Sequence, residues 1–274
     1  MTNTQNGHRD IASLSRLDGR VAIVTGGAGH IGSAVADALA EQGATVAVVD
    51  LDQGRCETVA RDIEQKRSTK TLALSVDLAD EAATRAIADR VVDTAGGIDV
   101  LIHVAALVSA EPLLNWTTPF EEQSTEVWRR ALEVNLTAVF ALTQACTPAL
   151  RASGNGSVVT FGSTYGIVGP DWSIYKGTDM GNAAGYAASK GGVIQLTRWL
   201  ATTLAPDIRV NTLSPGGVFR GHPESFKDAY EARTPLGRMA SEEDYKGAAV
   251  FLASDMSRYV TGHNLVVDGG WTAW

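Results

Sequence analysis

The chain has 274 residues, of which 45% are hydrophobic and 20% charged, as in an ordinary globular protein. Its 23 basic and 31 acidic residues give a formal net charge of -8, which argues against a non-specific nucleic-acid binder. No run of about 20 apolar residues is present to span a membrane. The two cysteines, Cys56 and Cys146, have neither metal-site nor disulfide-framework spacing, so we expect no metal and a reducing, cytoplasmic setting.

Apolar segments alternate with helix-like segments along nearly the whole chain. Buried strands are predicted at 21–24, 45–49, 71–76, 100–102, 157–161, 208–213 and 265–267. Helices are predicted at 31–42, 54–65, 81–94, 125–152, 184–204 and 241–253. This alternation predicts one α/β domain, a doubly wound (Rossmann) seven-stranded parallel sheet with helices on both faces.

Residues 1–16 are predicted to form a flexible N-terminal tail, and 17–274 the domain. Two long segments without strand character interrupt the alternation, at 166–182 and 219–238. Both follow the carboxyl ends of predicted strands, where open α/β sheets bind their ligands. We therefore expect these two loops to contact a small-molecule substrate.

A glycine-rich loop, Thr25-Gly26-Gly27-Ala28-Gly29-His30-Ile31-Gly32, joins the first strand to the first helix. Its Gly-x-Gly-x-x-Gly spacing matches a dinucleotide fingerprint, in which glycines let the backbone approach a pyrophosphate. Asp50 ends the next strand, where a carboxylate can bind the adenosine ribose and repel a 2′-phosphate. Because the first basic residue beyond it is Arg55, NAD is favoured over NADP, and the alternative is that Asp50 only forms a turn.

Tyr186 and Lys190 are four residues apart on a predicted helix and so share one face. An ammonium there would favour tyrosinate and lower the phenol pKa from its usual value of about 10. Such a phenol can exchange a proton with an alcohol or carbonyl oxygen. The same pair also occurs by chance on helix surfaces, so the other motifs have to support this interpretation.

In their order, the motifs resemble the short-chain dehydrogenase/reductase family over residues 17–271. The matching positions are the glycine-rich loop, Asp77, Asn135, Ser163, Tyr186-x-x-x-Lys190, Pro215-Gly216 and Val267-Asp268-Gly269-Gly270. The resemblance implies that Tyr186 is the acid/base and that Lys190 holds the nicotinamide ribose. It also implies that Ser163 bonds the reacting oxygen and that Asn135 helps to hold a proton-relaying water.

The same resemblance implies an NAD site and a homotetramer. The cofactor-binding residues would be Gly26, Gly29, His30, Ile31, Gly32, Asp50, Leu51, Asp77, Leu78, Val104, Ala105, Tyr186, Lys190, Pro215, Gly216 and Val218. The tetramer would be built from the helices near 125–152 and 184–205 and from the C-terminal strand region.

The chain departs from the family pattern at several positions. His30 replaces a usual glycine, Arg220 replaces a usual threonine, and His103-Val104-Ala105-Ala106 replaces an Asn-Asn-Ala-Gly sequence. Extra residues at 169–177 separate Ser163 from Tyr186. With 214–219 and 222–226, this insertion looks similar to bacterial oxidoreductases of surface-polysaccharide and flagellin-glycan sugar biosynthesis. A polar, sugar-like substrate is therefore expected, with Trp172, Phe219, Arg220 and His222 as candidate contacts.

The favoured function is an NAD-dependent oxidoreductase that interconverts a secondary alcohol and a carbonyl. A 3-oxoacyl reductase is an alternative, although it would prefer NADP and a basic docking surface. A sugar-nucleotide epimerase or dehydratase is a second alternative, but such enzymes usually carry a larger substrate domain. A non-catalytic nucleotide-sensing protein on the same fold is a third.

Overall fold

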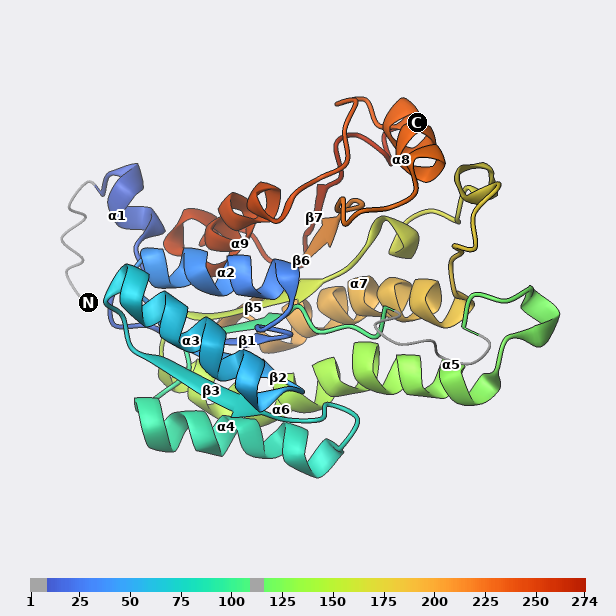
Figure 1. Ribbon diagram of the computed structural model, residues 1–274. Coiled ribbons are helices and arrows are strands. Elements are labelled where there is room, and N and C mark those ends of the chain that lie inside the picture. Colours follow the sequence, from blue (N-terminus) through green and yellow to red (C-terminus); the bar gives the residue numbers. More distant parts are fainter. Residues whose placement is uncertain (1–8, 109–115) are drawn as a thin grey trace.

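The structure is a computed structural model that describes residues 9–108 and 116–274 (Figure 1). Seven parallel strands form one sheet in the order β3-β2-β1-β4-β5-β6-β7, which confirms the predicted doubly wound architecture. The strands are β1 (Val21–Thr25), β2 (Thr45–Asp50), β3 (Thr71–Ser75), β4 (Val100–His103), β5 (Gly156–Phe161), β6 (Ile208–Pro215) and β7 (Asn264–Val267). The order reverses between β1 and β4, and at such a switch point the strand ends open a crevice for a ligand.

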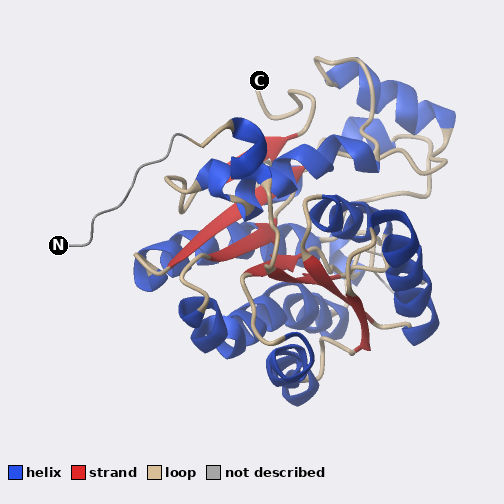
Figure 2. Ribbon diagram, turned by 90° about the vertical axis from the view of Figure 1, so that its left-hand side faces the viewer, coloured by secondary structure: helices blue, strands red, loops and turns tan. Residues whose placement is uncertain are grey.

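Helices cover both faces of the sheet (Figure 2). One layer contains α2 (His30–Glu41), α3 (Gln53–Arg67) and α9 (Lys246–Ala253), and the other contains α4 (Glu81–Ala95), α6 (Ala138–Ala152) and α7 (Ala184–Leu204). Along β1, Ala22 and Val24 pack into the first layer, whereas Val21 and Ile23 pack into the second. Because both sides of the sheet are buried, the central strands β1, β2 and β4 are nearly continuous runs of apolar residues.

The helix predicted at 125–152 is interrupted. It consists of α5 (Thr125–Leu132), a π-helical turn at Glu133–Thr137, and α6. A helical hydrophobic period does not reveal one wider turn, which is why the sequence indicated a single helix. The turn places Asn135 in a buried position.

Two other segments contain more helix than the sequence suggested. Within the expected tail, α1 (Ile11–Ser15) begins where the Asp10 carboxylate accepts a 2.7 Å hydrogen bond from the Ser13 backbone N–H, and residues 1–8 lie outside the described part. The 219–238 loop contains α8 (Glu224–Arg233), which stands away from the sheet in Figure 1. The predicted helix at 241–253 divides into a 3-10 turn at Glu242–Tyr245 and α9.

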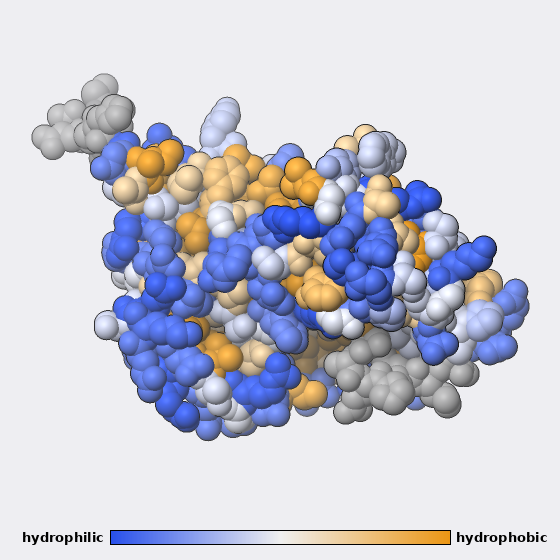
Figure 3. All heavy atoms as spheres, turned by 45° about the horizontal axis from the view of Figure 1, so that its top comes forward, coloured by the Kyte–Doolittle hydropathy of each residue, from blue (hydrophilic) through white to orange (hydrophobic). Residues whose placement is uncertain are grey.

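The surface is mixed in character, and Figure 3 shows hydrophobic residues gathered along the upper part of one face among hydrophilic ones. Within the described ranges, no helix has both the length and the apolar content needed to cross a bilayer. The same residues contain no cluster of three or more histidine, cysteine or acidic side chains placed to hold a metal ion.

Candidate active site

The glycine-rich loop packs against the end of β4 at the switch point. Gly26 has φ +66°, and a Cβ on it would lie 2.7 Å from the Ala105 Cα. A Cβ on Gly32 would collide with the carbonyl oxygen of Gly26. Gly29, the N-cap of α2, offers no side-chain cap, so the first N–H groups of the helix can receive an anion. The loop therefore has the shape and the donors that a dinucleotide pyrophosphate requires.

Asp50 ends β2 and lies against this loop. Its Oδ2 accepts a 3.0 Å hydrogen bond from the Ala28 N–H, and its Oδ1 accepts one of 2.8 Å from the Leu51 N–H. On the other side of Ala28, the Arg55 Nη2 donates to the Ala28 carbonyl oxygen at 2.8 Å. The end of β2 and the start of α3 thus hold the loop between a carboxylate and a guanidinium.

The other expected cofactor residues surround the same edge of the sheet. Asp77 follows β3, where its Oδ1 accepts from the Ala79 N–H at 2.9 Å and its Oδ2 lies 3.7 Å from Arg130 Nη2. Gly216 follows β6 and donates its N–H to the Val267 carbonyl oxygen at 2.9 Å. Ile31, Val104 and Val218 pack against the core layer of α2, and Leu78 packs against the opposite layer.

Tyr186 and Lys190 lie on α7, with the Lys190 Nζ 5.8 Å from the centre of the Tyr186 ring. The Nζ donates a 2.7 Å hydrogen bond to the carbonyl oxygen of Phe161 at the end of β5. Lys190 is only 3% exposed, and its burial lowers the ammonium pKa to about 8. The ammonium is therefore held in place, and with a pKa of about 8 it still carries its proton at neutral pH.

The phenol itself departs from the sequence expectation. Burial raises the pKa of Tyr186 above its usual value, and a side-chain hydrogen bond with Ser163 opposes that rise. The sequence predicted a lowered pKa because it showed the lysine four residues away but not the depth of the site. Ser163 is itself buried and caps the 3-10 turn Thr164–Gly166, accepting a 3.2 Å bond from the Tyr165 N–H.

Asn135 reaches the helix that carries the pair, but it bonds a neighbour of Lys190 rather than Lys190. Its Nδ2 donates to the Ser189 Oγ at 3.1 Å, and its Oδ1 accepts from the Leu107 N–H at 2.6 Å. The Ser189 hydroxyl donates in turn to the Tyr186 carbonyl oxygen at 2.7 Å. Ser189 therefore links the π-helical turn to the tyrosine, a role that the sequence analysis missed.

His103 ends β4 in the segment that departs from the family pattern. It is buried, and its Nε2 lies 3.0 Å from the Thr143 Oγ1. Burial, aided by the positive charge of Lys190, lowers the pKa of His103 to about 3. The imidazole is thus neutral and joins β4 to α6.

The expected substrate loops meet in an aromatic cluster. Successive ring centres are 5.8 Å apart for Trp172 and Tyr175, 5.5 Å for Tyr175 and Phe226, 5.1 Å for Phe226 and His222, and 6.1 Å for His222 and Phe219. Three of the four predicted substrate residues therefore belong to one chain of rings. Tyr175 and Phe226, whose contact joins the two loops, were not among the residues predicted from the sequence.

Polar contacts also join the two loops. The Arg233 Nη1 lies 2.6 Å from the Asp171 Oδ2, and its Nη2 donates to the Ser173 Oγ at 3.2 Å. The hydroxyl groups of Tyr165 and Tyr175 are 2.5 Å apart. Burial, the neighbouring Tyr175 and the more distant Tyr186 all raise the pKa of Tyr165, which keeps its hydroxyl protonated near the candidate acid/base.

Arg220 is the fourth expected substrate contact, and its side chain shares a carboxylate with His30 of the glycine-rich loop. Its Nε lies 3.5 Å from the Glu242 Oε1, and the same oxygen lies 3.8 Å from the Nδ1 of His30 in the glycine-rich loop. The Glu242–Tyr245 turn is fixed to the strand end because the Tyr245 hydroxyl donates to the Gly216 carbonyl oxygen at 3.0 Å. Glu242 thus links the loop after β6 to the glycine-rich loop, a contact without a sequence signal.

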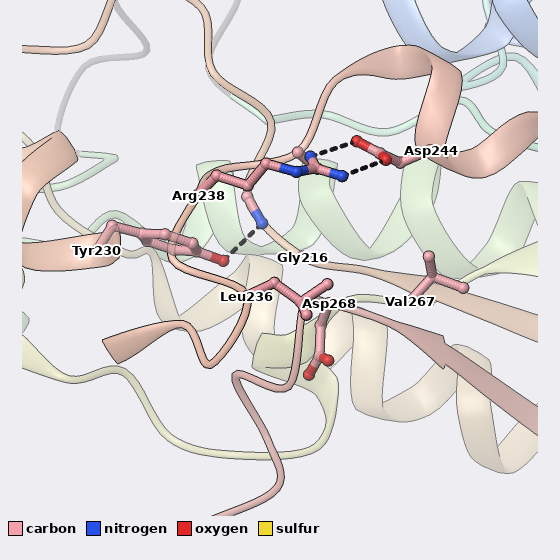
Figure 4. Close-up of a pocket in the computed structure, with 10 residues that line it drawn as sticks. Gly216, Tyr230, Leu236, Arg238, Asp244, Val267 and Asp268 are labelled. Atoms are coloured by element: carbon pink, nitrogen blue, oxygen red, sulfur yellow. Dashed lines mark hydrogen bonds and ion pairs between the residues drawn. The ribbon is translucent and has the colours of Figure 1, made fainter. Parts of the chain in front are cut away.

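A small pocket opens behind Gly216 (Figure 4). In this view the Arg238 guanidinium faces the Asp244 carboxylate, and the two groups pair at 2.6 and 2.8 Å. The Gly217 N–H donates to the Tyr230 hydroxyl at 2.6 Å. These contacts lie on the pocket side of the chain and fix the backbone at the end of β6. Pro215 and Gly216 are therefore held in place at the edge of the crevice.

Several known proteins are similar to this chain over nearly its whole length. A family model described as "Enoyl-(Acyl carrier protein) reductase" matches residues 26–272. Cis-4-hydroxycyclohexanecarboxylate dehydrogenase of Sinomonas cyclohexanicum is 37% identical over 93% of this chain and 97% of its own. D-threitol dehydrogenase of Mycolicibacterium smegmatis is 36% identical over 94% of each chain. The structure of a gluconate 5-dehydrogenase from Burkholderia cenocepacia, in complex with NADP and tartrate, aligns with a TM-score of 0.85 at 30% identity, covering 97% of this chain and 100% of that one.

Proposed function

The chain belongs to the short-chain dehydrogenase/reductase family, and from that membership we propose an NAD(H)-dependent dehydrogenase in which Tyr186 exchanges the substrate proton. The observation that carries the proposal is the convergence of Tyr186, Ser163 and Lys190 at the end of β5, beside the switch point. Its named relatives are dehydrogenases of CH–OH groups, so the reaction class is the interconversion of a secondary alcohol and a carbonyl.

A bound nicotinamide would supply the hydride acceptor or donor in this crevice. Tyr186 would take the hydroxyl proton during oxidation and return one during reduction. Ser163 would donate a hydrogen bond to the reacting oxygen. The buried ammonium of Lys190 would stabilise the phenolate that forms when Tyr186 has lost its proton. Burial alone opposes that ionisation, so the positive charge has to be placed nearby.

We favour NAD as the cofactor because Asp50 ends β2 and bonds the glycine-rich loop at Ala28. A 2′-phosphate placed beside that carboxylate would be repelled. The gluconate 5-dehydrogenase relative was solved with NADP, so both cofactors belong in the test. Arg55 bonds the Ala28 carbonyl oxygen from the opposite side, where it supports the loop.

For the substrate we propose a secondary alcohol on an alicyclic ring. Tyr186 packs against an apolar cluster of Trp116, Ala131 and Ala183, and such an apolar surface suits a hydrocarbon ring. The dehydrogenase for cis-4-hydroxycyclohexanecarboxylate has a ring substrate of this kind. A polyol or sugar-like substrate is the second candidate, and the D-threitol relative and the hydroxyl groups of Tyr165 and Tyr175 favour it.

A screen of alcohols with both cofactors tests the two candidate substrate classes. The protein is incubated with NAD+ or NADP+ and with matched alcohols: cyclohexanol, cyclopentanol, cis-4-hydroxycyclohexanecarboxylate, D-threitol and gluconate, while the reduced cofactor is followed by absorbance. We expect the highest kcat/KM with a ring alcohol and NAD+. Turnover confined to polyols would replace the ring proposal, and preferred reduction of a 3-oxoacyl thioester with NADPH would favour a 3-oxoacyl reductase. Failure to bind any dinucleotide would reject the dehydrogenase.

A homotetramer is part of the same proposal. Trp128 on α5, Phe140 on α6 and Trp199 on α7 are large apolar side chains that are 38%, 40% and 55% exposed. A second copy of the chain packing on these helices would cover them. Light scattering of the purified protein distinguishes a tetramer from smaller assemblies.

A further inference from the structure

We propose that Arg220 is a movable clamp for the pyrophosphate of the cofactor, held beside the glycine-rich loop by Glu242 until the dinucleotide binds. The inference rests on the proposed dinucleotide function and assigns a role to two residues that depart from the family pattern, His30 and Arg220. Both meet at one carboxylate oxygen of Glu242.

The first support is the position of this oxygen. His30 is the first residue of α2, and its side chain is 63% exposed over the helix N-terminus, where a pyrophosphate would lie. The Oε1 of Glu242 lies 3.8 Å from the His30 Nδ1 and 3.5 Å from the Arg220 Nε. The guanidinium is therefore held next to the anion site, although Arg220 belongs to the loop after β6.

The second support is the weakness of the contact. At 3.5 Å, the Nε–Oε1 separation is beyond a good hydrogen bond, and both side chains are about a third exposed. Breaking the contact between Arg220 and Glu242 therefore costs little free energy. The guanidinium still has its Nη donors to bind two phosphate oxygens in the fork geometry that arginine favours. Glu242 would repel the same phosphates, so departure of Arg220 toward them is favoured.

The third support is that Arg220 is joined to the substrate side. Its backbone N–H donates to the His222 Nδ1 at 3.2 Å, and the N–H of the preceding Phe219 donates to the Ala240 carbonyl oxygen at 2.9 Å. His222 stacks on Phe226 in the aromatic cluster. The backbone of Arg220 is therefore continuous with the aromatic cluster, so the clamp lies between the proposed cofactor site and the proposed substrate loops.

The adjacent acidic residues provide a matched control. Glu243 pairs with Lys246 at 2.7 Å, and Asp244 pairs with Arg238 at 2.6 Å, so each has a partner away from His30 and Arg220. Glu243→Gln removes the same charge from the neighbouring position without changing the Arg220 contact.

The test measures equilibrium binding without turnover. Dissociation constants for NADH and for ADP-ribose, which has the pyrophosphate but no nicotinamide, are compared in the wild type, Arg220→Ala, Glu242→Gln and Glu243→Gln by fluorescence titration. Arg220→Ala should raise the dissociation constants of both ligands by about tenfold, because one charge-assisted contact is lost. Glu242→Gln should lower both dissociation constants, and Glu243→Gln should leave both unchanged.

The outcomes are distinguishable. Weaker binding of NADH alone in Arg220→Ala would place the arginine on the nicotinamide and overturn the clamp. Equal affinities in all four proteins would make Arg220 and Glu242 a surface pair. If wild type bound neither ligand, the dehydrogenase proposal itself would fall. Circular dichroism and the melting temperature verify that each variant is folded.

Discussion

Lys190 on α7 donates a 2.7 Å hydrogen bond to the carbonyl oxygen of Phe161, the last residue of β5. Ser163 follows Phe161 by two residues, and Tyr186 lies one helical turn before Lys190. This single bond therefore ties the helix of the tyrosine to the strand that leads to the serine. The spacing of the two hydroxyl groups is set by rigid elements, although the loop between them is long.

Tyr186→Phe should lower kcat by at least about 10²-fold, because the proton acceptor is lost while the ring and its packing stay. The dissociation constant for NADH, measured by fluorescence, should change little. Tyr259→Phe is the control, since Tyr259 is fully exposed. Near-normal turnover in Tyr186→Phe would assign the proton transfer to another group.

Lys190→Met should stabilise the folded protein at neutral pH and abolish activity. Burial lowers the lysine pKa from 10.5 to about 8, so the folded state binds the proton less tightly than the unfolded chain. Burying the charged lysine destabilises the wild type fully below the folded pKa of about 8, and this destabilisation declines as the pH rises toward the unfolded value of 10.5. Between these two pH values, the free energy of unfolding of the wild type should therefore rise relative to that of the variant.

Urea unfolding at several pH values checks this prediction. The difference in free energy of unfolding between the two proteins isolates Lys190 from other groups that titrate in the same range. A difference that stays constant from neutral to alkaline pH would mean that the lysine ionises normally in the folded state.

Asp50→Asn should reduce the preference for NAD over NADP by about tenfold or more, since the repulsion of a 2′-phosphate disappears. The amide oxygen can still accept the bond from Ala28. The measurement is the ratio of kcat/KM for the two cofactors. Asp52→Asn is the matched control, because Asp52 caps α3 by accepting from the Arg55 N–H. An unchanged ratio in Asp50→Asn would leave Asp50 a turn residue.

Gly32→Ala should eliminate dinucleotide binding, because its Cβ would collide with the Gly26 carbonyl oxygen and force the loop open. Gly247→Ala is the control: a Cβ there meets nothing within 4 Å, and alanine favours the helix. NADH titration and thermal melting separate loss of binding from loss of folding. Normal NADH affinity in Gly32→Ala would show that the loop adapts at little cost.

Breaking the link between the substrate loops should raise KM for the alcohol roughly two- to fivefold, about the effect of one exposed ion pair. Arg233→Ala, Asp171→Asn and the double variant form a cycle, and the double variant should be no worse than either single one. Lys227→Ala is the control, because it removes ion pairs with Glu224 and Glu231 that lie within α8 and do not join the two loops. Additive effects would mean that the two residues act separately.

Much of the fold could be predicted from the sequence because strands buried on both faces are continuous apolar runs. In β2, for example, Thr45 and Asp50 stand at the two ends of a fully apolar and buried segment. The glycine-rich loop and Asp50 were also recognisable, since backbone crowding requires glycine at positions such as Gly26. These features depend on residues close together in the chain.

The features that escaped prediction depend on distant residues. Glu242 meets His30 although the two lie near opposite ends of the chain, and no local pattern marks the contact. The contact between Tyr165 and Tyr175 depends on how an inserted loop folds back. The pKa of Tyr186 depends on burial, which spacing on a helix does not reveal. Such properties arise only from tertiary packing.

The π-helical turn at Glu133–Thr137 makes the number of residues between α5 and α6 a constraint in itself. The wider turn takes up one residue more than an α-helical turn, so α5 and α6 continue in nearly the same helical phase. Removing one residue there would allow an uninterrupted α-helix with both flanks in place, but the turn that presents Asn135 to Ser189 would be lost. Such a deletion would remove the hydrogen bond between the two helical segments while leaving the helices themselves intact.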